Sequence, residues 1–552
     1  MSKNFVRYKR MPVVSYPERQ WPEKQIEKAP IWCSVDLRDG NQALIEPMVV
    51  EEKIEFFTFL VNMGFKEIEV GFPSASQIEF DFLRQLVDRK LIPDDVVVQV
   101  LVQCREHLIT RTFEALKGVK QAIVHIYNST SILQRDVVFG MDKNQIKEIA
   151  IEGAALVKKM AANFPGTIYL EYSPESFTGT ELEYALEVCT AVQDIWEPSK
   201  DNKIIFNLPS TVEMTTPNVY ADQIEWMHRH FKDRECITLS VHPHNDRGTG
   251  VAAAELAILA GADRVEGTLF GNGERTGNVD VLNLAFNMFS QGIDPELEIE
   301  NVKDIIEIYE RCCKIPVGPR HPYAGKLVFT AFSGSHQDAI NKGIQAMKDR
   351  KSEIWEVPYL PIDPSDVGRD YEPIVRINSQ SGKGGVAFVM DTYFGYKLPK
   401  GMHKEFAVCI QKIAEVQGEV SPDTIMEQFE SEYLKRKVPF EFIKVQAADI
   451  GDTDTSVVLS FKYKGLEQTI EGVGNGPIDA VAKIIYENTG MNVKVLDYSE
   501  HALGEGSHAK AAAYIHMLDK VTGKTTFGVG VSSNITRASI RAFFSALNRL
   551  SI

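Results

Sequence analysis

The stretch ITLSVHPHNDRG, residues 237–248, contains the most informative pattern of this chain. An apolar run, Ile237 to Val241, is followed at once by His242, Pro243 and His244. Residues two apart on an extended strand point to the same face, so both imidazoles can meet one metal ion. Imidazole suits zinc, manganese, iron and similar divalent ions. By itself the pair also fits a purely structural role, and a second cluster is needed to decide.

That second cluster is DLRDGNQ, residues 36–42, which follows the apolar run Ile31 to Val35. It offers the carboxylate of Asp39 beside the guanidinium of Arg38. Two polar clusters at the ends of two apolar runs favour a shared site over two unrelated structural features.

Short apolar runs recur from residue 31 to residue 269, separated by segments with helical periodicity such as Glu51 to Met63 and Lys147 to Ala161. We predict eight strands: Ile31 to Val35, Glu67 to Gly71, Val96 to Val102, Gln121 to Tyr127, Thr167 to Tyr172, Lys203 to Leu208, Ile237 to Val241 and Arg264 to Leu269. Eight strands alternating with helices indicate an α/β fold, a (β/α)₈ TIM barrel rather than an open doubly wound sheet.

Polar residues stand where these strands end, and in such a barrel the chemistry lies at the carboxyl ends of the strands. The residues are Arg38, Asp39, His125, Ser173, Glu175, Asn207, Thr211, His242, His244 and the loop Gly271 to Asn278. So many convergent polar groups favour an enzyme over a scaffold.

Composition narrows the class of protein. The chain has 552 residues and a formal net charge of -16, which argues against nucleic acid or an anionic membrane as the main partner. Its seven cysteines are scattered and form no CxxC pair, so we expect neither a disulfide framework nor a zinc knuckle. No stretch is long and apolar enough for a membrane span, and we expect a cytoplasmic protein.

The length suggests several domains. We predict an N-terminal extension over residues 1–30, the barrel over 31–325, helical connector subdomains over 326–435 and a C-terminal α+β domain over 436–552. The connector contains the glycine-rich loop 378–385, which lacks the GxxxxGK[ST] spacing of a phosphate loop.

The C-terminal domain contains an internal repeat. Each half reads as strand, turn, strand, glycine turn and helix: Ser456 to Tyr463, Gln468 to Gly472 and a helix through Tyr486, then Ala511 to Leu518, Thr525 to Gly528 and a helix from about Asn534 to Leu547. The glycine turns could aim helix amino termini at a carboxylate, which predicts a small-molecule effector site. A dimerisation module is the alternative.

With these clusters in view, the chain resembles the 2-isopropylmalate synthase family, in the group related to homocitrate synthase, citramalate synthase and the hydroxymethylglutaryl-CoA lyases. The matching stretches are DLRDGNQAL (36–44), YSPESFTGT (172–180), LPSTVEMTTP (208–217), HPHNDRG (242–248), EGTLFGNGERTGN (266–278), SGSHQDAI (333–340) and SQSGKGGV (379–386). They cover the barrel and the connector and, more loosely, the repeat.

The resemblance implies a Claisen-type condensation of acetyl-CoA with 3-methyl-2-oxobutanoate, followed by thioester hydrolysis to 2-isopropylmalate, the first committed step of leucine biosynthesis. It implies a divalent cation on Asp39, His242, His244 and Asn278. A mixed oxygen and nitrogen ligand set admits Mg²⁺, which we favour, and also Mn²⁺ or Zn²⁺. A monovalent cation such as K⁺ is a further candidate cofactor.

The resemblance also implies residue roles, which are expectations at this point. Arg38 would place positive charge near the developing alkoxide, and Glu175 would contact substrate or transfer a proton. The 2-oxo acid would bind at His125, Ser173 and Thr211. The base for acetyl-CoA would be His336, with Tyr371 nearby. The acetyl-CoA side would include Gly273, Glu274 and Arg275.

For the repeat, the resemblance implies feedback inhibition by leucine, with Gly474, Asn475, Gly476 and Ala511 at the effector site. It further implies a homodimer in which the connector of one subunit covers the partner's site.

Two other classes of function remain open. A lyase that cleaves a carbon–carbon bond on the same metal site would share DLRDG and HPHND but would need neither connector nor repeat. A metabolite sensor on an inactive barrel would need a broken site, and no expected ligand is missing here.

Overall fold

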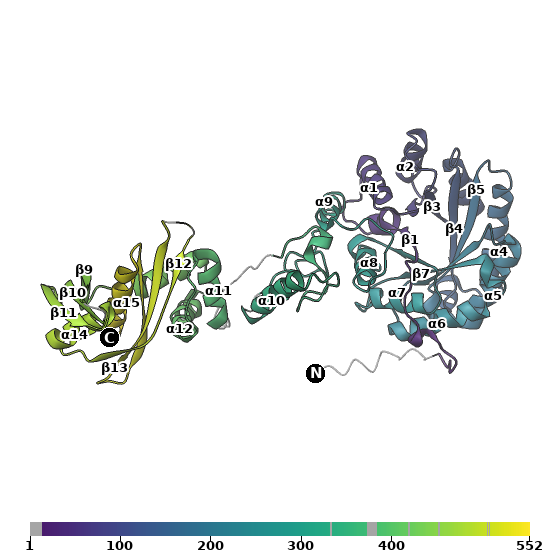
Figure 1. Cartoon of the computed structure of the whole chain (residues 1–552). Coiled ribbons are helices and arrows are strands. Elements are labelled where there is room, and N and C mark those ends of the chain that lie inside the picture. The colour runs from purple at the N-terminus through teal and green to yellow at the C-terminus, as the bar shows by residue number, and fades with distance from the viewer. Residues whose placement is uncertain are drawn as a thin grey trace. The chain divides into compact units, whose positions relative to one another are not determined.

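The computed structural model describes residues 14–331, 334–371, 383–417, 420–450, 453–504, 506 and 508–551. The chain forms two compact units (Figure 1). The first comprises Met1–Val328 and Ile362–Asp370, and the second comprises Phe329–Pro361 and Tyr371–Ile552. The domain boundaries drawn from the sequence stay predictions.

The first unit contains a closed barrel of eight parallel strands in sequential order, which confirms the predicted TIM barrel. The barrel closes where β8 pairs with β1, with Arg264 opposite Ile31 and Gly267 opposite Ser34. The strands are β1 (Ile31–Ser34), β2 (Glu67–Gly71), β3 (Val97–Gln103), β4 (Gln121–Ser129), β5 (Thr167–Glu175), β6 (Ile204–Ser210), β7 (Ile237–Pro243) and β8 (Arg264–Gly267).

Helices surround this barrel (Figure 1). They are α1 (Val50–Asn62), α2 (Gln77–Asp88), α3 (Glu106–Ala115), α4 (Lys143–Ala161), α5 (Leu182–Trp196), α6 (Pro217–His230), α7 (Gly250–Leu259), α8 (Val281–Phe289) and α9 (Val302–Cys313). Local sequence explains where several of them begin: in α4, Asp142 accepts a hydrogen bond from the Gln145 backbone, and the Gln145 side chain accepts one from the Asp142 backbone in return.

Five barrel strands extend beyond the apolar runs that predicted them. β3 continues to Gln103, β4 to Ser129, β5 to Glu175, β6 to Ser210 and β7 to Pro243. In each case the added residues include at least one polar residue, and they remain in the ladder because the neighbouring strand pairs with them, as Ser129 does with Glu175. The predicted strand at 264–269 is shorter, ending at Gly267.

The second unit begins with helices, as the sequence indicated for residues 326–435. They are α10 (Gly334–Arg350), α11 (Lys383–Phe394), α12 (Lys400–Gln417) and α13 (Pro422–Phe429). Much of the predicted glycine-rich loop, residues 378–382, lies outside the described residues, and α11 begins directly after it. Among the described residues, every helix is too short or too polar to span a lipid bilayer.

The internal repeat is present, with one strand more per half than predicted. The first half is β9 (Phe440–Ile450), β10 (Asp454–Tyr463), β11 (Leu466–Gly474) and α14 (Pro477–Thr489), and the second is β12 (Val493–Leu503), β13 (Lys510–Asp519), β14 (Thr525–Ser532) and α15 (Ile535–Leu550). The two missed strands, β9 and β12, are sheet edges with mostly exposed or half-buried residues. Such strands lack the apolar alternation that identifies a half-buried strand.

The helical part and the repeat share one core within the second unit. Met402 and Phe406 of α12 and Phe429 of α13 pack in the same buried cluster as Tyr514 of β13 and Phe527 of β14. The other face of β13 packs against α14 and α15 in a second cluster. Because of these shared clusters, cutting the chain between the helical part and the repeat would expose buried apolar side chains on both sides.

Candidate active site

A cavity of about 350 Å³ opens at the carboxyl ends of the barrel strands. It is lined by residues from most of the eight strands or the loops that follow them: Arg38, Asp39, Gln42, Phe72, Leu101, His125, Tyr127, Ser173, Glu175, Asn207, Pro209, Thr211, His242, His244, Glu274 and Arg275. Ten of these side chains were singled out from the sequence as catalytic, metal-binding or substrate-binding residues, and the fold brings them to one hollow.

The DLRDG segment reaches the cavity because the chain forms a single π-helical turn, η3 (Asp36–Gly40), soon after β1. The Val35 carbonyl accepts hydrogen bonds from the backbone N–H groups of Arg38 and Asp39, which fixes both residues at the strand end. Arg38 Nη1 lies 2.6 Å from Asp39 Oδ1, and Arg38 Nε donates to the buried Glu69. The guanidinium is therefore held between two carboxylates.

His242 lies near the end of β7 and His244 directly follows the strand, and both face Asp39. Their Nε2 atoms lie 3.5 Å and 3.8 Å from Asp39 Oδ2. Ligand atoms of the three residues all lie within 4.8 Å of one another, and all three residues are buried. His242 Nδ1 lies 2.8 Å from Glu266 Oε2, so Nε2 is the nitrogen directed at Asp39.

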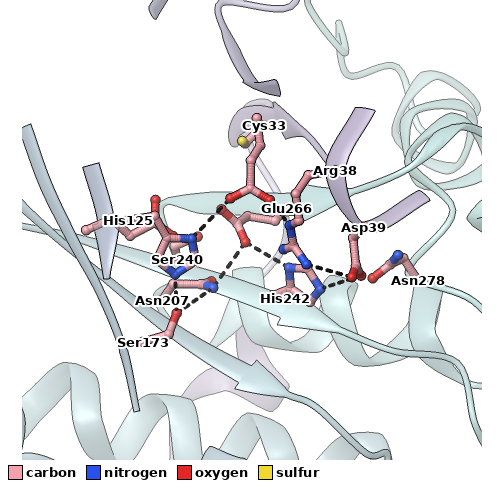
Figure 2. A network of polar contacts seen from close by, with 12 residues as sticks. Cys33, Arg38, Asp39, His125, Ser173, Asn207, Ser240, His242, Glu266 and Asn278 are labelled. Carbon is pink, nitrogen blue, oxygen red and sulfur yellow. Dashed lines mark hydrogen bonds and ion pairs between the residues drawn. The ribbon is translucent and has the colours of Figure 1, made fainter. Parts of the chain in front are cut away.

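Two oxygens at this site are buried without a hydrogen-bond partner: Asp39 Oδ2 and Asn278 Oδ1. Figure 2 shows the Asn278 amide oxygen turned towards the Asp39 carboxylate. Two acceptors that face each other with no hydrogen between them are costly unless a cation lies there. Carboxylate, amide oxygen and imidazole nitrogen are suitable ligands for a divalent ion, so the residues present fit the implied metal.

Electrostatics keep this ligand set ready for a cation. Burial raises the pKa of Asp39, but Arg38 and the two histidines outweigh it and hold that pKa well below its ordinary value. Burial, together with the neighbouring His242, lowers the pKa of His244 to about 4. For His242, burial is outweighed by Asp39 and Glu266, which raise its pKa to about 9. Asp39 is thus an anion and His244 neutral at pH 7, as metal ligation requires, whereas His242 must release a proton when a cation binds.

The residues expected to hold the 2-oxo acid lie along β4, β5 and β6. His125 Nε2 is 2.8 Å from Ser173 Oγ, and Asn207 Nδ2 donates to the same oxygen at 3.1 Å. Glu175 accepts from the Ser129 hydroxyl. Thr211 Oγ1 accepts from the backbone N–H of Ser176 at 2.9 Å.

The loop after β8 supplies Gly273, Glu274 and Arg275. A Cβ on Gly273 would overlap the Asn278 side chain. Glycine at this position therefore allows the loop backbone to lie close against Asn278, the expected metal ligand. Glu274 Oε1 accepts from Gln42 Nε2 at 3.2 Å. The Arg275 guanidinium donates to Asp246 Oδ1 and to the carbonyl oxygen of Thr211, each at 2.6 Å.

Sequence reasoning missed a buried polar layer beneath the cavity. It contains Glu69, Gln99, Glu171, Arg264 and Glu266, all with 0% exposure. The signal was available, because these are charged or amide residues inside apolar strand runs, where an unpaired polar group is costly. Glu69, His125 and Glu266 also approach one another closely enough for a metal. Arg38, Gln99 and Arg264 already donate to these two carboxylates, so the cluster is an internal network.

The remaining predicted residues lie in the second unit. His336 is exposed on α10 and stacks on Tyr359, with ring centroids 4.1 Å apart. The Tyr371 hydroxyl is buried without a hydrogen-bond partner, and burial raises its pKa. Near the start of α14, Asn475 N donates to Asp479 Oδ2, and Ala511 lies half-buried on β13.

Comparison with known proteins agrees with this architecture. Residues 29–308 match the HMGL-like family, residues 326–391 the alpha-isopropylmalate synthase post-catalytic domain-like family, and residues 419–551 the LeuA allosteric (dimerisation) domain. The 2-isopropylmalate synthase of Clostridium acetobutylicum is 57% identical over 552 residues, covering 98% of this chain and 99% of that protein. The chain belongs to the 2-isopropylmalate synthase family. The 2-isopropylmalate synthase of Agrobacterium fabrum is 54% identical and covers 100% of this chain and 99% of that protein.

Membership of the 2-isopropylmalate synthase family supports the interpretation of the barrel cavity as an active site. The HMGL-like match spans the strands that carry Asp39, His242 and His244, and this buried group indicates a divalent metal. The match of residues 419–551 to an allosteric dimerisation domain agrees with the repeat recognised in the sequence.

Proposed function

We propose that this chain condenses acetyl-CoA with 3-methyl-2-oxobutanoate and hydrolyses the resulting thioester, which yields 2-isopropylmalate and CoA. One observation carries the proposal: a single barrel-mouth cavity joins a buried Asp39, His242 and His244 group to the Arg38 guanidinium. Full-length similarity to proteins named 2-isopropylmalate synthase supports the same activity.

Asp39, His242 and His244 would hold the cation, with Asn278 Oδ1 as a fourth protein ligand. When bound, a divalent ion would polarise the ketone of the 2-oxo acid and stabilise negative charge that develops on its oxygen. We favour Mg²⁺, with Mn²⁺ or Zn²⁺ as alternatives and K⁺ as a further candidate cofactor. The unpartnered oxygens of Asp39 and Asn278 support this assignment.

Arg38 would contribute fixed positive charge on the same side of the substrate. Its position is determined by Asp39 and Glu69, so it needs no reorganisation when charge develops. The carboxylate of the 2-oxo acid would bind near Thr211, and His125 and Ser173 would orient its body. Glu175, the last residue of β5, lines the same cavity and would contact substrate or transfer a proton.

The branched side chain of the 2-oxo acid would face the apolar part of the same cavity. Phe72, Leu101 and Pro209 line it, with the ring of Tyr127. A mainly apolar wall favours an isopropyl group over a charged carboxymethyl group because it offers no partner for the added charge.

A second hollow supports binding of acetyl-CoA. It has a volume of about 710 Å³ and shares Arg38, Gln42 and Phe72 with the catalytic cavity. Its remaining lining is mostly apolar, with Met48, Ile78 and their neighbours. The pantetheine arm would leave the catalytic cavity along this hollow, and Gly273, Glu274 and Arg275 would border the thioester end.

We further propose that His336 removes the methyl proton of acetyl-CoA and that Tyr371 assists. The support is the resemblance, together with the exposed position of the His336 imidazole on α10. In the homodimer, the connector of one subunit would cover the partner's site. Solvent exchange of the acetyl-CoA methyl hydrogens measures this step, and unchanged exchange in His336→Ala would assign the histidine to structure.

Leucine is the proposed effector, bound around Gly474, Asn475, Gly476 and Ala511. The match of residues 419–551 to an allosteric domain supports a regulatory role. Because Asp479 already accepts from Asn475 N, the ligand carboxylate would use other donors at this turn.

The activity is tested by following free thiol while the full chain is given acetyl-CoA and, in turn, 3-methyl-2-oxobutanoate, pyruvate or 2-oxoglutarate. We expect fastest turnover with 3-methyl-2-oxobutanoate and loss of turnover with a chelator. Cleavage of 3-hydroxy-3-methylglutaryl-CoA to acetyl-CoA and acetoacetate, measured as acetoacetate because this reaction releases no free thiol, would instead indicate a lyase. Neither condensation nor cleavage would indicate a sensor.

A further inference from the structure

Glu266 on β8 is the most highly connected carboxylate beneath the catalytic cavity. It is fully buried, and both of its oxygens are saturated with donors. Oε1 accepts from Gln99 Nε2 at 2.8 Å and from Arg264 Nη1 at 2.9 Å. Oε2 accepts from His242 Nδ1 at 2.8 Å and from Asn207 Nδ2 at 3.1 Å (Figure 2).

The contact with His242 decides which imidazole nitrogen is available to a cation. An ionised carboxylate only accepts hydrogen bonds, so His242 Nδ1 must carry a proton to make this bond. The neutral ring then has its lone pair on Nε2, the nitrogen that faces Asp39. Glu266 therefore selects the tautomer that can bind a metal.

The contact with Asn207 leads from the same oxygen to the 2-oxo acid residues. Asn207 Nδ2 has two hydrogens: one reaches Glu266 and the other reaches Ser173 Oγ at 3.1 Å. Ser173 Oγ in turn lies 2.8 Å from His125 Nε2. One carboxylate oxygen is thus shared by a metal ligand and by the chain of side chains that lines the substrate pocket.

We propose that Glu266 is a positioning residue that orients His242 for the cation and, through Asn207, orients Ser173 and His125 for the 2-oxo acid. This inference rests on the proposed function and assigns a role to a residue that touches neither reactant. Arg264 and Gln99 anchor the carboxylate from below, which leaves Oε2 for the two upward contacts.

Glutamine cannot replace this carboxylate without a conflict. Its NH₂ group would face either His242 Nδ1 and Asn207, or Arg264 and Gln99, and each choice sets donor against donor. In the first case the imidazole must accept at Nδ1, which places its proton on the nitrogen that faces Asp39.

The test measures Mn²⁺ binding to the full chain by electron paramagnetic resonance, with the metal alone. Loss of a group that orients a metal ligand typically lowers affinity about 10- to 100-fold, so we expect this range for Glu266→Gln. The matched control is Glu225→Gln: Glu225 is also fully buried and accepts from Arg229 and a backbone N–H, but lies on α6 outside the cavity. The Glu225→Gln variant should bind Mn²⁺ within about threefold of wild type, because Glu225 orients no metal ligand.

A second variant distinguishes the contact of Glu266 with His242 from its contact with Asn207. Asn207→Leu leaves the His242 contact intact, so Mn²⁺ affinity should stay within about threefold while KM for 3-methyl-2-oxobutanoate rises at least about tenfold, the order expected from a lost buried hydrogen bond. An unchanged KM would overturn the link to the substrate residues. Mn²⁺ affinity of Glu266→Gln equal to wild type would overturn the link to His242.

A measurement on wild type covers the case in which Glu266→Gln does not fold. In ¹⁵N-histidine-labelled protein loaded with Mg²⁺, the protonated ring nitrogen of His242 should be Nδ1, and protonation of Nε2 would overturn the inference. Failure of wild type to bind Mn²⁺ at all would overturn the proposed metal site itself, and this inference with it.

Discussion

At the scale of single residues, Arg275 and Asp246 hold three loops of the barrel mouth together. Arg275 on the loop after β8 bonds Asp246 on the loop after β7 and the carbonyl oxygen of Thr211 after β6. Asp246 Oδ2 also accepts from the backbone N–H of Glu213 at 2.9 Å. This connection fixes the position of Thr211, which we propose contacts the 2-oxo acid.

We therefore expect Arg275→Lys and Asp246→Asn each to raise KM for 3-methyl-2-oxobutanoate about tenfold, and the double variant to be less than additive, as for residues in contact. Lysine cannot reproduce the forked contacts of arginine. Steady-state kinetics check this, with Lys66→Met as the control because the Lys66–Asp95 pair is exposed and remote from the cavity. Additive effects would show that the two side chains act separately.

Asp36, at the start of the same DLRDG motif, should make stability depend on pH. Burial raises its pKa from 3.8 to about 7, although Ser34 and the backbone of Leu269 donate to it. A raised folded-state pKa means that the folded protein binds the proton more tightly than the unfolded chain. The stabilisation is complete below about pH 4, falls as pH rises and is lost above about pH 7.

The measurement is urea unfolding of wild type and Asp36→Asn from pH 4 to pH 8. Over this window the stability of wild type relative to the variant should fall by about 4 kcal/mol, at about 1.4 kcal/mol per pKa unit. A difference that does not change with pH would contradict the assignment.

Much of the candidate site could be predicted from single residues, because the polar clusters stand directly after apolar runs. Asp39, His242 and His244 followed from strand ends and ligand chemistry, although their roles stay predictions. For Glu266 and Glu69, a charged residue inside an apolar strand run indicated a buried group that needs donors, but the sequence could not identify those donors. Their donors come from strands far away in sequence, such as Gln99 and Arg264.

At the scale of elements, the eight barrel strands could be predicted because both faces of each are covered, which makes them apolar runs. β3 illustrates this, with five consecutive buried residues. The ends of β4 to β7 could not, because those residues are polar and stay extended only through pairing with a neighbour. β9 and β12 were missed because an edge strand with an exposed face carries a weak pattern.

The glycines of β14 were interpreted as turn residues that could open a ligand site, and the structure gives them a packing role as well. A Cβ on Gly528 would overlap backbone atoms of Ala542 and Ala546, and one on Gly530 would overlap backbone atoms of Ala538 and Ala542. Both glycines therefore let α15 lie close against the sheet.

We expect Gly528→Ala to lower the free energy of unfolding by about 1–3 kcal/mol, because the helix backbone must move to admit the methyl group. Gly476→Ala is the control, since its Cβ would meet nothing within 4 Å. Denaturant unfolding of the full chain compares the two. Equal stability of both variants would mean that α15 shifts at no cost.

At the scale of the whole molecule, the chain combines a barrel that carries the candidate active site with a repeat that matches an allosteric dimerisation domain. Truncation near residue 430 would be a poor test of this, because it removes Tyr514 and Phe527 from the core they share with Phe406 and Phe429. A point substitution at the proposed effector site leaves that core in place.

Ala511→Phe should abolish leucine binding to the full chain, measured by calorimetry. Turnover without leucine should stay within about twofold of wild type, since an effector affects catalysis only through its differential affinity for two states. Val521→Phe, at an exposed turn at the other end of the same strand pair, is the control. If wild type itself binds no leucine, the repeat is a dimerisation module.

We expect one divalent cation at the barrel mouth to receive the 2-oxo acid, and anomalous X-ray scattering at the manganese edge can locate that cation. Crystals of the full chain grown with Mn²⁺ and 3-methyl-2-oxobutanoate should show one strong anomalous peak between Asp39, His242 and His244, with the 2-oxo acid beside it. Absence of a peak there, or a 2-oxo acid bound elsewhere in the barrel, would contradict the account.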